Sequence, residues 1–368
     1  MQIPDIGNLR LANQQVSKSR FASIGELVGW MGGIQAQDYA MAKWALGIRL
    51  PGFTDDMVEM ALGSGEVFRT HVLRPTWHLV ARDDLRWMLQ LTAPRIIASM
   101  NARHKQLELS GKLLAKCNTL LEKTLSGGLS LTREELMTML RQNGIETNKN
   151  RSSHILMWAE LHAIICSGTS SGKRPTYALV EERVPRSKPL HKEEALATLA
   201  HRYFNSHGPA TLQDFVWWSG LQVSDARNGL EMVKPMLDSM EAGSDVYWFK
   251  NGKGNKIRSD AVYLLPAYDE FLISYRDRSA VLSLSDHTRA VSDNGLFRPV
   301  IVLGSQVAGI WKRTVEKNTM LIEMQPFDGD PMEQFASGIL FDAAVEKFRK
   351  FISPEIRIKV IVSKNAVS

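Results

Sequence analysis

The segment Gln35-Ala36-Gln37-Asp38 contains two glutamines separated by one residue, directly before a stretch that favours a helix. Two carboxamides at this spacing can each donate and accept hydrogen bonds, so together they could hold one water molecule in a fixed orientation. Neither side chain ionises, so the pair could position a nucleophile but could not act as a titrating base. The usual role of such glutamines is solvated or capping, and Asp38 is expected to cap the following helix.

The sequence gives little support to other chemistries. Only two cysteines occur, Cys117 and Cys166, which argues against a disulfide framework, a thiolate zinc cluster and an iron–sulfur centre. The nine histidines form no His-Glu-x-x-His or Cys/His array, so we expect no catalytic metal and no cofactor. The glutamine motif contains no lysine, so Schiff-base chemistry is not expected there.

Composition indicates a folded protein of several compact units. The chain has 368 residues, of which 44% are hydrophobic and 23% charged, and this length favours two to four separate cores. There is no uninterrupted apolar run of roughly 18 residues and no apolar signal core at the start, so we expect a cytoplasmic protein. The net charge of +6 suits a polyanionic partner.

Two segments share the order of a capped helix, a break, a second helix and a hairpin, which is the order of a winged helix. In the first segment Thr132 and Glu135 have capping-box spacing, and a second helix is expected from Arg151. The Gly/Ser-rich stretch 167–174 is then expected to be the wing tip, between strands at 164–166 and 176–180.

The second segment repeats this order after an expected linker at 184–190. Thr211 and Asp214 are placed to cap one helix, and another helix is expected from Ser224. Residues 247–250 are expected to form a hairpin whose turn is Asn251-Gly252, because Asn-Gly favours tight hairpin turns.

The N-terminal hundred residues carry a more degenerate copy of the pattern. Ser23, Asp38 and Thr54 are each expected to start a helix. Residues 67–80 are expected to form a hairpin with Pro75 at its tip. This hairpin would present four basic side chains, Arg69, His71, Arg74 and His78.

The last hundred residues change to a mainly β pattern, with strands expected at 300–303, 309–311, 320–324 and 356–362 and a helix near 335–351. The predicted fold class is therefore α+β, with tandem winged-helix (helix-turn-helix) units and a C-terminal β-rich module. The expected domains are 1–120, 121–187, 188–262 and 263–368.

Four motifs, taken together in their order along the chain, resemble one known family. They are Gly33-Ile-Gln35-Ala-Gln37-Asp38, Leu73-Arg-Pro-Thr76-Trp-His78-Leu-Val80, His207-Gly-Pro-Ala-Thr211 with Trp218-Ser-Gly220, and Leu265-Pro-Ala-Tyr268-Asp269-Glu-Phe-Leu272 with Tyr275-Arg276-Asp-Arg278. In this order they resemble the AlkZ-like and YcaQ-like DNA glycosylases, whose members contain tandem winged helices and a C-terminal β-rich domain. Gln37 matches the AlkZ-like branch, because the YcaQ-like branch has a carboxylate at this position.

The resemblance implies that Gln35 and Gln37 are catalytic and that the protein is a monofunctional glycosylase without a cofactor. Its implied substrates are N3- and N7-alkylated purines, including bulky or crosslinked ones, in double-stranded DNA. Such a base already carries positive charge and leaves without protonation, so positioning the attacking water would be sufficient.

Basic and polar residues on the hairpin and the second helices are candidates for DNA contacts. The candidates are Arg69, Arg74, Thr76, His78, Arg151, His154, Arg227, Arg276 and Arg278. A satisfied strand histidine is the alternative for His78, and a solvated basic face is the alternative for those on helices. Tyr268, Asp269, Arg276 and Arg278 could equally form a structural ion-pair network.

Two other functions compete with the enzyme, namely a non-catalytic winged-helix transcriptional regulator and a structural or protein-binding array. Regulators of this type are commonly dimers that carry one such unit with a dimerisation helix or a ligand domain, and neither accompaniment is evident in the sequence. We therefore expect a monomeric enzyme that acts on double-stranded DNA, associated with the nucleoid in the cytoplasm and not with a membrane.

Overall fold

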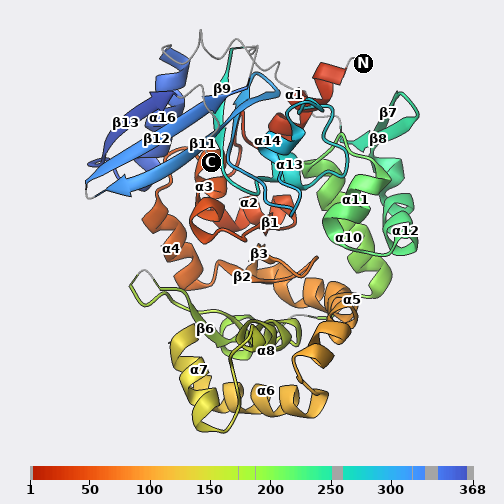
Figure 1. Ribbon diagram of the computed structural model, residues 1–368. Coiled ribbons are helices and arrows are strands. Elements are labelled where there is room, and N and C mark those ends of the chain that lie inside the picture. The colour runs from red at the N-terminus through yellow and green to blue at the C-terminus, as the bar shows by residue number, and fades with distance from the viewer. Residues whose placement is uncertain are drawn as a thin grey trace.

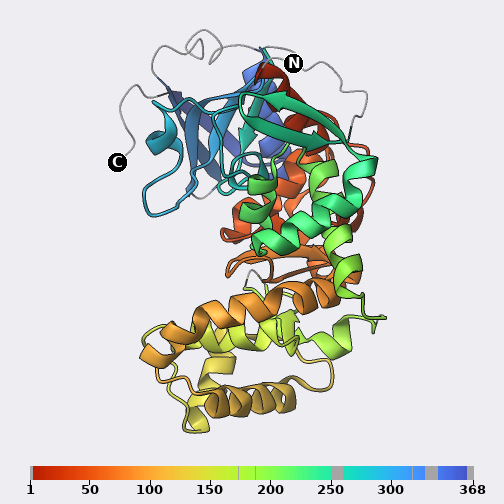
Figure 2. The same ribbon diagram turned by 90° about the vertical axis from the view of Figure 1, so that its right-hand side faces the viewer.

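The computed structural model describes residues 3–172, 174–186, 188–250, 260–316, 318–327 and 339–362. Figure 1 shows an upper part that holds the N-terminal helices and the C-terminal sheet, and a lower part built around α6, α7 and α8. The β2–β3 hairpin and helix α5 lie between them, as Figure 2 shows from the side. In the described residues no helix has the length and apolarity that a membrane crossing requires.

The N-terminal helices begin where the sequence predicts. Ser23, Asp38 and Thr54 each accept a hydrogen bond from a main-chain N–H in the first turn of α2, α3 and α4, and the predicted hairpin is confirmed as β2 and β3. The elements are α1 (Ile3–Asn13), α2 (Ile24–Met31), β1 (Ile34–Gln35), α3 (Tyr39–Arg49), α4 (Asp55–Ser64), β2 (Val67–His71) and β3 (Trp77–Ala81).

The lower part contains the first predicted helix–helix–hairpin segment. The capping box of Thr132 and Glu135 is present at the start of α7. A three-stranded sheet follows in the order β4-β6-β5, and the predicted wing tip joins β5 to β6. The elements are η1 (Arg82–Asp84), α5 (Leu85–Gln106), α6 (Gly111–Leu125), β4 (Leu131–Thr132), α7 (Arg133–Gln142), α8 (Arg151–Leu161), β5 (Ile165–Ser167), β6 (Thr176–Leu179) and α9 (Val180–Arg183).

The second segment has the predicted helices and a hairpin, β7–β8, that the sequence did not predict. The strand that contains Tyr247 pairs with the residues before it, and the turn lies at Gly243, whose φ of 62° suits a glycine. The predicted turn Asn251-Gly252 lies outside the described residues. The elements are α10 (Lys192–Ser206), α11 (Leu212–Ser219), α12 (Val223–Val233), η2 (Lys234–Met236), β7 (Asp238–Ala242) and β8 (Asp245–Phe249).

The C-terminal part is a five-stranded sheet in the order β13-β12-β11-β10-β9, in which only the β12–β13 pair is parallel. The predicted strands are present, and β9 adds an edge that the sequence analysis did not predict. The elements are β9 (Val262–Leu265), α13 (Glu270–Ile273), α14 (His287–Ala290), β10 (Val300–Leu303), β11 (Gln306–Glu316), β12 (Thr319–Pro326), α16 (Ile339–Ile352) and β13 (Arg357–Val362).

The two ends of the chain build one hydrophobic core. Side chains of α2, α3 and β1 are buried together with those of the C-terminal sheet and α16, and the ring of Trp44 packs against Phe348 and Phe351. A Cβ atom on Gly47 would lie 2.3 Å from the ring of Phe351, so this close packing requires glycine. The predicted boundaries 1–120 and 263–368 therefore separate segments that fold against each other.

A buried ion pair reinforces this contact. The Arg49 guanidinium donates two hydrogen bonds of 2.8 Å to the Asp269 carboxylate, and both side chains are almost completely buried. Arg49 also donates to the main-chain oxygen of Gln14. The pair therefore joins α1, α3 and the segment before α13.

Replacing Asp269 with alanine should lower the free energy of unfolding by about 3–5 kcal/mol, because the Arg49 charge would stay buried without its partner. Lys312→Ala, which removes one side of the more exposed Lys312–Glu323 pair, is the control and should cost about 1 kcal/mol or less. Denaturant unfolding followed by circular dichroism measures both. Equal effects of the two changes would contradict the structural role of the Arg49–Asp269 pair.

Candidate active site

The glutamine motif lies on the edge of a small antiparallel sheet with strand order β1-β3-β2. Gln35 is paired with His78, and His78 is paired with Thr70 on the other side. Directly paired residues project to the same face of a sheet. One face of this sheet therefore carries Gln35, His78 and Thr70 in a row.

The side chain of Gln35 is held in one orientation. It is only 3% exposed, and its Oε1 accepts hydrogen bonds from Arg74 Nη2 at 3.1 Å and from Thr76 Oγ1 at 3.3 Å. A guanidinium can only donate, so the atom facing Arg74 must be the amide oxygen. The Gln35 Nε2 has no hydrogen-bond partner among the residues that the structure describes, and it is therefore available as a donor.

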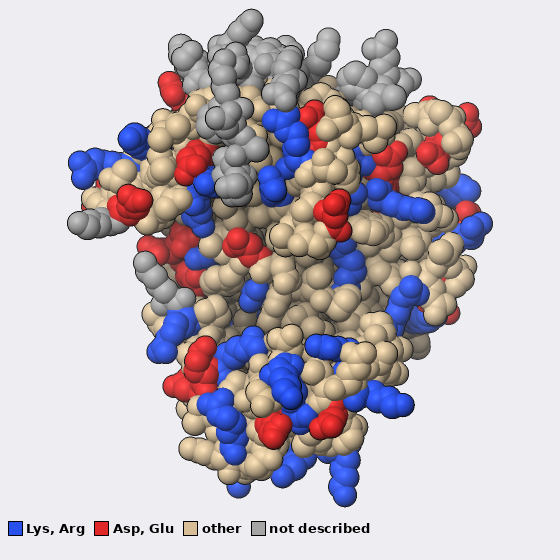
Figure 3. Space-filling view, viewed as in Figure 1, with Lys and Arg blue, Asp and Glu red and all other residues tan. Residues whose placement is uncertain are grey.

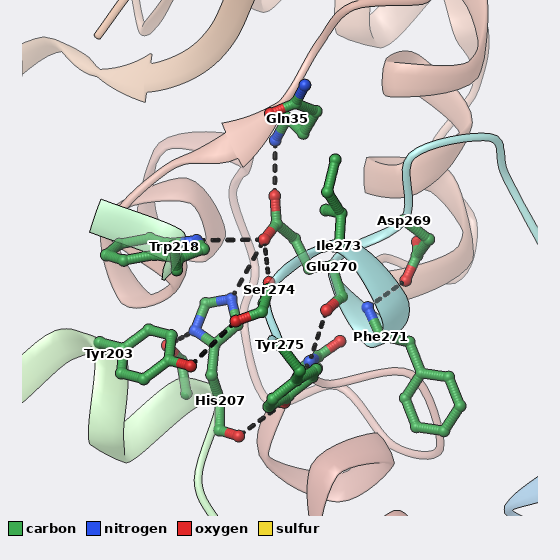
Figure 4. Close-up of polar contacts among 12 residues, drawn as sticks. Gln35, Tyr203, His207, Trp218, Asp269, Glu270, Phe271, Ile273, Ser274 and Tyr275 are labelled. Atoms are coloured by element: carbon green, nitrogen blue, oxygen red, sulfur yellow. Dashed lines mark hydrogen bonds and ion pairs between the residues drawn. The ribbon is translucent and has the colours of Figure 1, made fainter. Parts of the chain in front are cut away.

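The main chain of Gln35 is held by a buried carboxylate from the C-terminal part. Glu270 Oε1 accepts the Gln35 N–H at 2.6 Å, and Oε2 accepts from Trp218 Nε1 at 3.2 Å and from the Ser274 hydroxyl. His207 Nε2 lies 3.4 Å from the same carboxylate. Figure 4 shows Glu270 at the centre of these contacts, which come from three separate parts of the chain.

The charge of Glu270 is stabilised despite its burial. Burial by itself would raise the pKa of the Glu270 carboxyl, but the hydrogen bonds and charge of His207, the Ser274 hydroxyl and the Gln35 N–H lower this pKa to about 2. Burial also lowers the pKa of the Arg74 guanidinium, and the Glu270 charge opposes that shift. Gln35 thus lies between a buried cation on its side chain and a buried anion on its main chain.

His78 lies beneath this arrangement as a neutral group. Burial, reinforced by the nearby Arg74 charge, lowers the pKa of His78 to about 3. Its Nδ1 lies 2.9 Å from the carbonyl oxygen of Thr76, which can only accept, so Nδ1 carries the proton. His78 Nε2, Thr70 Oγ1 and Arg74 Nε are buried without a hydrogen-bond partner in the described part of the chain.

The opposite face of the hairpin supports the motif through Arg69. The guanidinium lies 4.1 Å from the centre of the Trp77 ring and donates to the carbonyl oxygen of Ala36 at 3.0 and 2.9 Å. Ala36 is the residue between the two glutamines. The hairpin therefore holds the motif from both faces.

Gln37 is exposed where the chain bends between β1 and α3, and Asp38 caps α3 as predicted. Figure 3 shows a hollow that crosses the middle of the molecule, with Lys and Arg side chains, and some Asp and Glu side chains, above and below it. The side chain of Gln37 is accessible because the residue is exposed, while that of Gln35 is held by Arg74 and Thr76 of the hairpin loop.

Two of the predicted DNA contacts are not supported by the structure. His78 is fully buried, so its side chain does not reach DNA in this conformation. Arg151 is buried too, and its guanidinium donates to the main-chain oxygens of Glu146 and Leu107, so it stabilises the start of α8. His154 is half-buried with its ring 5.2 Å from that of His104, and it is not part of the glutamine site.

Arg69, Arg74 and Thr76 are half-buried and are hydrogen-bonded to the glutamine motif, and two of the other three candidates are exposed. Arg227 is exposed on α12 and Arg276 is exposed after α13. Arg278 is half-buried, lies 5.5 Å from the centre of the Trp217 ring, and donates to the main-chain oxygen of Leu272. Burial lowers the pKa of Arg278 to about 10, which leaves it charged at neutral pH. Neither Arg276 nor Arg278 joins the Arg49–Asp269 pair.

The main-chain partner of Gln35, Glu270, and the side chains around that carboxylate were not predicted from the sequence. Glu270, Trp218 and His207 lie within two of the motifs that carry the family resemblance, but their side chains were given no role. A signal was present for Glu270, since it stands beside the apolar run Phe271-Leu-Ile273, where an unpaired carboxylate is costly. No local sequence pattern indicated which groups would donate hydrogen bonds to the Glu270 carboxylate.

Comparison with known proteins places the chain among the DNA glycosylases, which are hydrolases. More narrowly, it belongs to the AlkZ-like DNA glycosylase family, whose model matches residues 28–351. The family predicted from the four motifs is thereby confirmed.

A sequence match and a structural match, both from Streptomyces sahachiroi, illustrate this similarity. A protein named interstrand DNA cross-link repair glycosylase is 22% identical over 320 residues, which are 82% of this chain and 85% of that protein. The solved structure of the DNA glycosylase AlkZ superimposes with a TM-score of 0.79 over 99% of this chain and 100% of that chain, at 18% identity. The structural match supports the α+β fold.

His78→Gln should flatten the dependence of stability on pH. The folded state keeps His78 neutral down to a pKa of about 3, whereas the ordinary value is 6.5, so between these values only the unfolded chain binds this proton. The contribution of His78 to the free energy of unfolding is therefore fully present above pH 6.5. As the pH falls below this value, His78 lowers the free energy of unfolding by at most about 1.4 kcal/mol per pH unit.

Unfolding by denaturant at several pH values measures this slope. Thr70→Val, which changes the neighbouring position on the same face without adding or removing a titratable group, is the control and should keep the wild-type slope. An unchanged slope in the His78→Gln protein would show that His78 is not held neutral in the folded state.

Proposed function

We propose that this protein is a monofunctional glycosylase that hydrolyses the N-glycosidic bond of N3- or N7-alkylated purines in double-stranded DNA. The observation that carries the proposal is the hydrogen bonding of the Gln35 amide together with the exposure of the Gln37 amide. Arg74 and Thr76 occupy the oxygen of Gln35 and leave its Nε2 free, while Gln37 is exposed beside it. A donor and an acceptor can thus meet the same water molecule.

The proposed division of labour follows from this orientation. Gln35 Nε2 donates a hydrogen bond to the oxygen of the water, and the carbonyl of Gln37 accepts a hydrogen bond from it, so the remaining lone pair is directed at the sugar carbon. As the C–O bond forms and the bond to the base breaks, the attacking water releases a proton to bulk solvent. The alkylated base leaves as a neutral group because it already carries positive charge. No general acid is required for its departure.

Lyase chemistry is not part of the proposal. Lys43 on α3 follows the motif most closely, and its Nζ lies 2.7 Å from both Asp55 and Glu59. A lysine held as a cation by two carboxylates is a poor nucleophile for a Schiff base. The reaction proposed here therefore ends with release of the base and an abasic site.

DNA binding is assigned to the hollow in Figure 3 and to two helix–helix–hairpin segments, which we interpret as winged helices. Arg227 on α12 and Arg276 and Arg278 after α13 are the proposed phosphate contacts, since phosphate contacts position a protein on duplex DNA. We propose a monomer, with 121–187 and 188–262 as its two clearest winged-helix units. By analogy with the crosslink-repair relative, bulky or crosslinked purines are included among the proposed substrates.

Gln37→Ala should lower the single-turnover rate of base release by about 10²-fold or more, as observed when a group that contacts only the reacting atoms is removed. The assay measures release from a duplex that contains N7-methylguanine. Gln142→Ala, at the exposed end of α7, is the matched control and should have the wild-type rate. Salt-dependent duplex binding by the wild type without any release would instead support a DNA-binding regulator.

The rate of base release should change by less than about threefold between pH 5.5 and 8.5, because the proposed catalytic amides do not ionise. The two buried groups nearest to them do not titrate in this range, since the pKa of Glu270 is about 2 and that of His78 is about 3. Single-turnover rates with saturating enzyme test this expectation. A sigmoidal loss of rate with a midpoint in this range would identify a titrating catalytic group.

A further inference from the structure

Three motifs of this chain meet at one carboxylate that the proposed water-positioning step does not use. Glu270 accepts the main-chain N–H of Gln35, the indole N–H of Trp218 and the hydroxyl of Ser274, and His207 lies beside it. Gln35 precedes Glu270 by 235 residues. Glu270 itself has no exposed surface, so it does not contact DNA or the attacking water.

We propose that Glu270 is a positioning residue that fixes the main chain of Gln35 and thereby aims the amide of Gln35. This inference rests on the proposed role of the two glutamines in base release. Arg74 and Thr76 hold the far end of the side chain, and Glu270 holds its origin at 2.6 Å. With both ends held, the amide cannot swing without breaking a charge-assisted hydrogen bond.

A neutral residue cannot replace this carboxylate. The donors of Gln35, Trp218 and Ser274 converge on two carboxylate oxygens. An amide of the same size offers one acceptor and one donor group, so at least one of these N–H or O–H groups would face an NH₂. The side chain at this position is therefore specified by its charge and acceptor capacity as well as by its volume.

A purely structural role for Glu270 is the main competitor. Its contacts with Trp218 and Ser274 join α11 to α13 and would stabilise the fold without any effect on Gln35. The two roles make different predictions, because a positioning effect disappears when Gln35 has no amide to aim. A double-mutant cycle between the two positions separates them.

The experiment measures single-turnover base release from an N7-methylguanine duplex by the full chain and by Glu270→Gln, Gln35→Ala and the double variant. Glu270→Gln should be slower than wild type by about 10- to 100-fold, the range expected for misplacement of a reacting group by about 1 Å. Its affinity for the duplex should stay within about twofold. In the Gln35→Ala background, Glu270→Gln should cause no further loss of rate.

Asp269→Asn is the matched control, since it removes the charge of the neighbouring buried carboxylate, which contacts Arg49 and not Gln35. Its folded fraction should release base at the wild-type rate within about threefold. An equal loss of rate in this control, or a full additional loss from Glu270→Gln in the Gln35→Ala background, would overturn the proposal. If Glu270→Gln does not fold, Glu270→Asp takes its place, because it keeps the charge but has a shorter side chain. It should likewise cause no further loss of rate in the Gln35→Ala background.

Amide hydrogen exchange provides a readout that does not depend on catalysis. Exchange of the peptide that covers 33–38 should increase in Glu270→Gln and stay at the wild-type level in Asp269→Asn, and no increase in Glu270→Gln would overturn the positioning role. A wild-type protein that releases no base from any alkylated duplex would overturn the proposed function instead. The two failures are thus distinguishable.

Discussion

The docking of the parts of this molecule depends most on the hydrogen bonds to the buried carboxylate of Glu270. An ionised carboxylate without contact with water is strongly unfavourable unless hydrogen-bond donors surround it. Here those donors come from β1, from α11 and from the end of α13, and His207 at the end of α10 lies 3.4 Å from the carboxylate. The N-terminal strand, the second helix–helix–hairpin segment and the C-terminal part must therefore be docked together before the charge is compensated. The same docking brings the amide of Gln35 against the hairpin, so the geometry of the candidate site and the docking of the parts have one physical cause.

Local signals in the sequence predicted the helix starts and the β2–β3 hairpin around this site, but not strand β1 or helix α13. Ser23, Asp38, Thr54 and Thr132 cap helices where predicted, because a cap is a contact within one turn of chain. The hairpin of β7 and β8, with its turn at Gly243, was not predicted, and the predicted turn Asn251-Gly252 lies outside the described residues. The catalytic role of the glutamine motif was predicted from the family resemblance that four short sequence motifs carry. The contact of Gln35 with Glu270 was not found, because nothing in either segment specifies a partner 235 residues away.

The roles of the basic residues also could not be predicted from local sequence alone. A basic residue at the start of a second helix is a reasonable DNA contact when only its position in the helix is known. In the structure the Arg151 guanidinium instead donates to two main-chain oxygens, which is a frequent use of arginine near loops and helix ends because it offers five donors. Arg227, the fifth residue of the second helix in the other segment, is exposed. Both arginines lie on second helices, and their three-dimensional surroundings separate a structural arginine from one that is available to a phosphate.

The charges around Gln35 also bear on the kind of base that the site could accept. Arg74 brings a buried positive charge to the amide oxygen of Gln35, and by itself this charge would oppose the approach of a cationic alkylated base. Glu270 supplies the compensating negative charge on the other side of the same residue, and its effect reaches Arg74. The pair leaves the immediate surroundings of Gln35 close to electrically neutral while keeping the amide rigid. A neutral and rigid site suits a reaction in which the substrate carries its own positive charge, because the protein then needs to orient water and has no proton to supply.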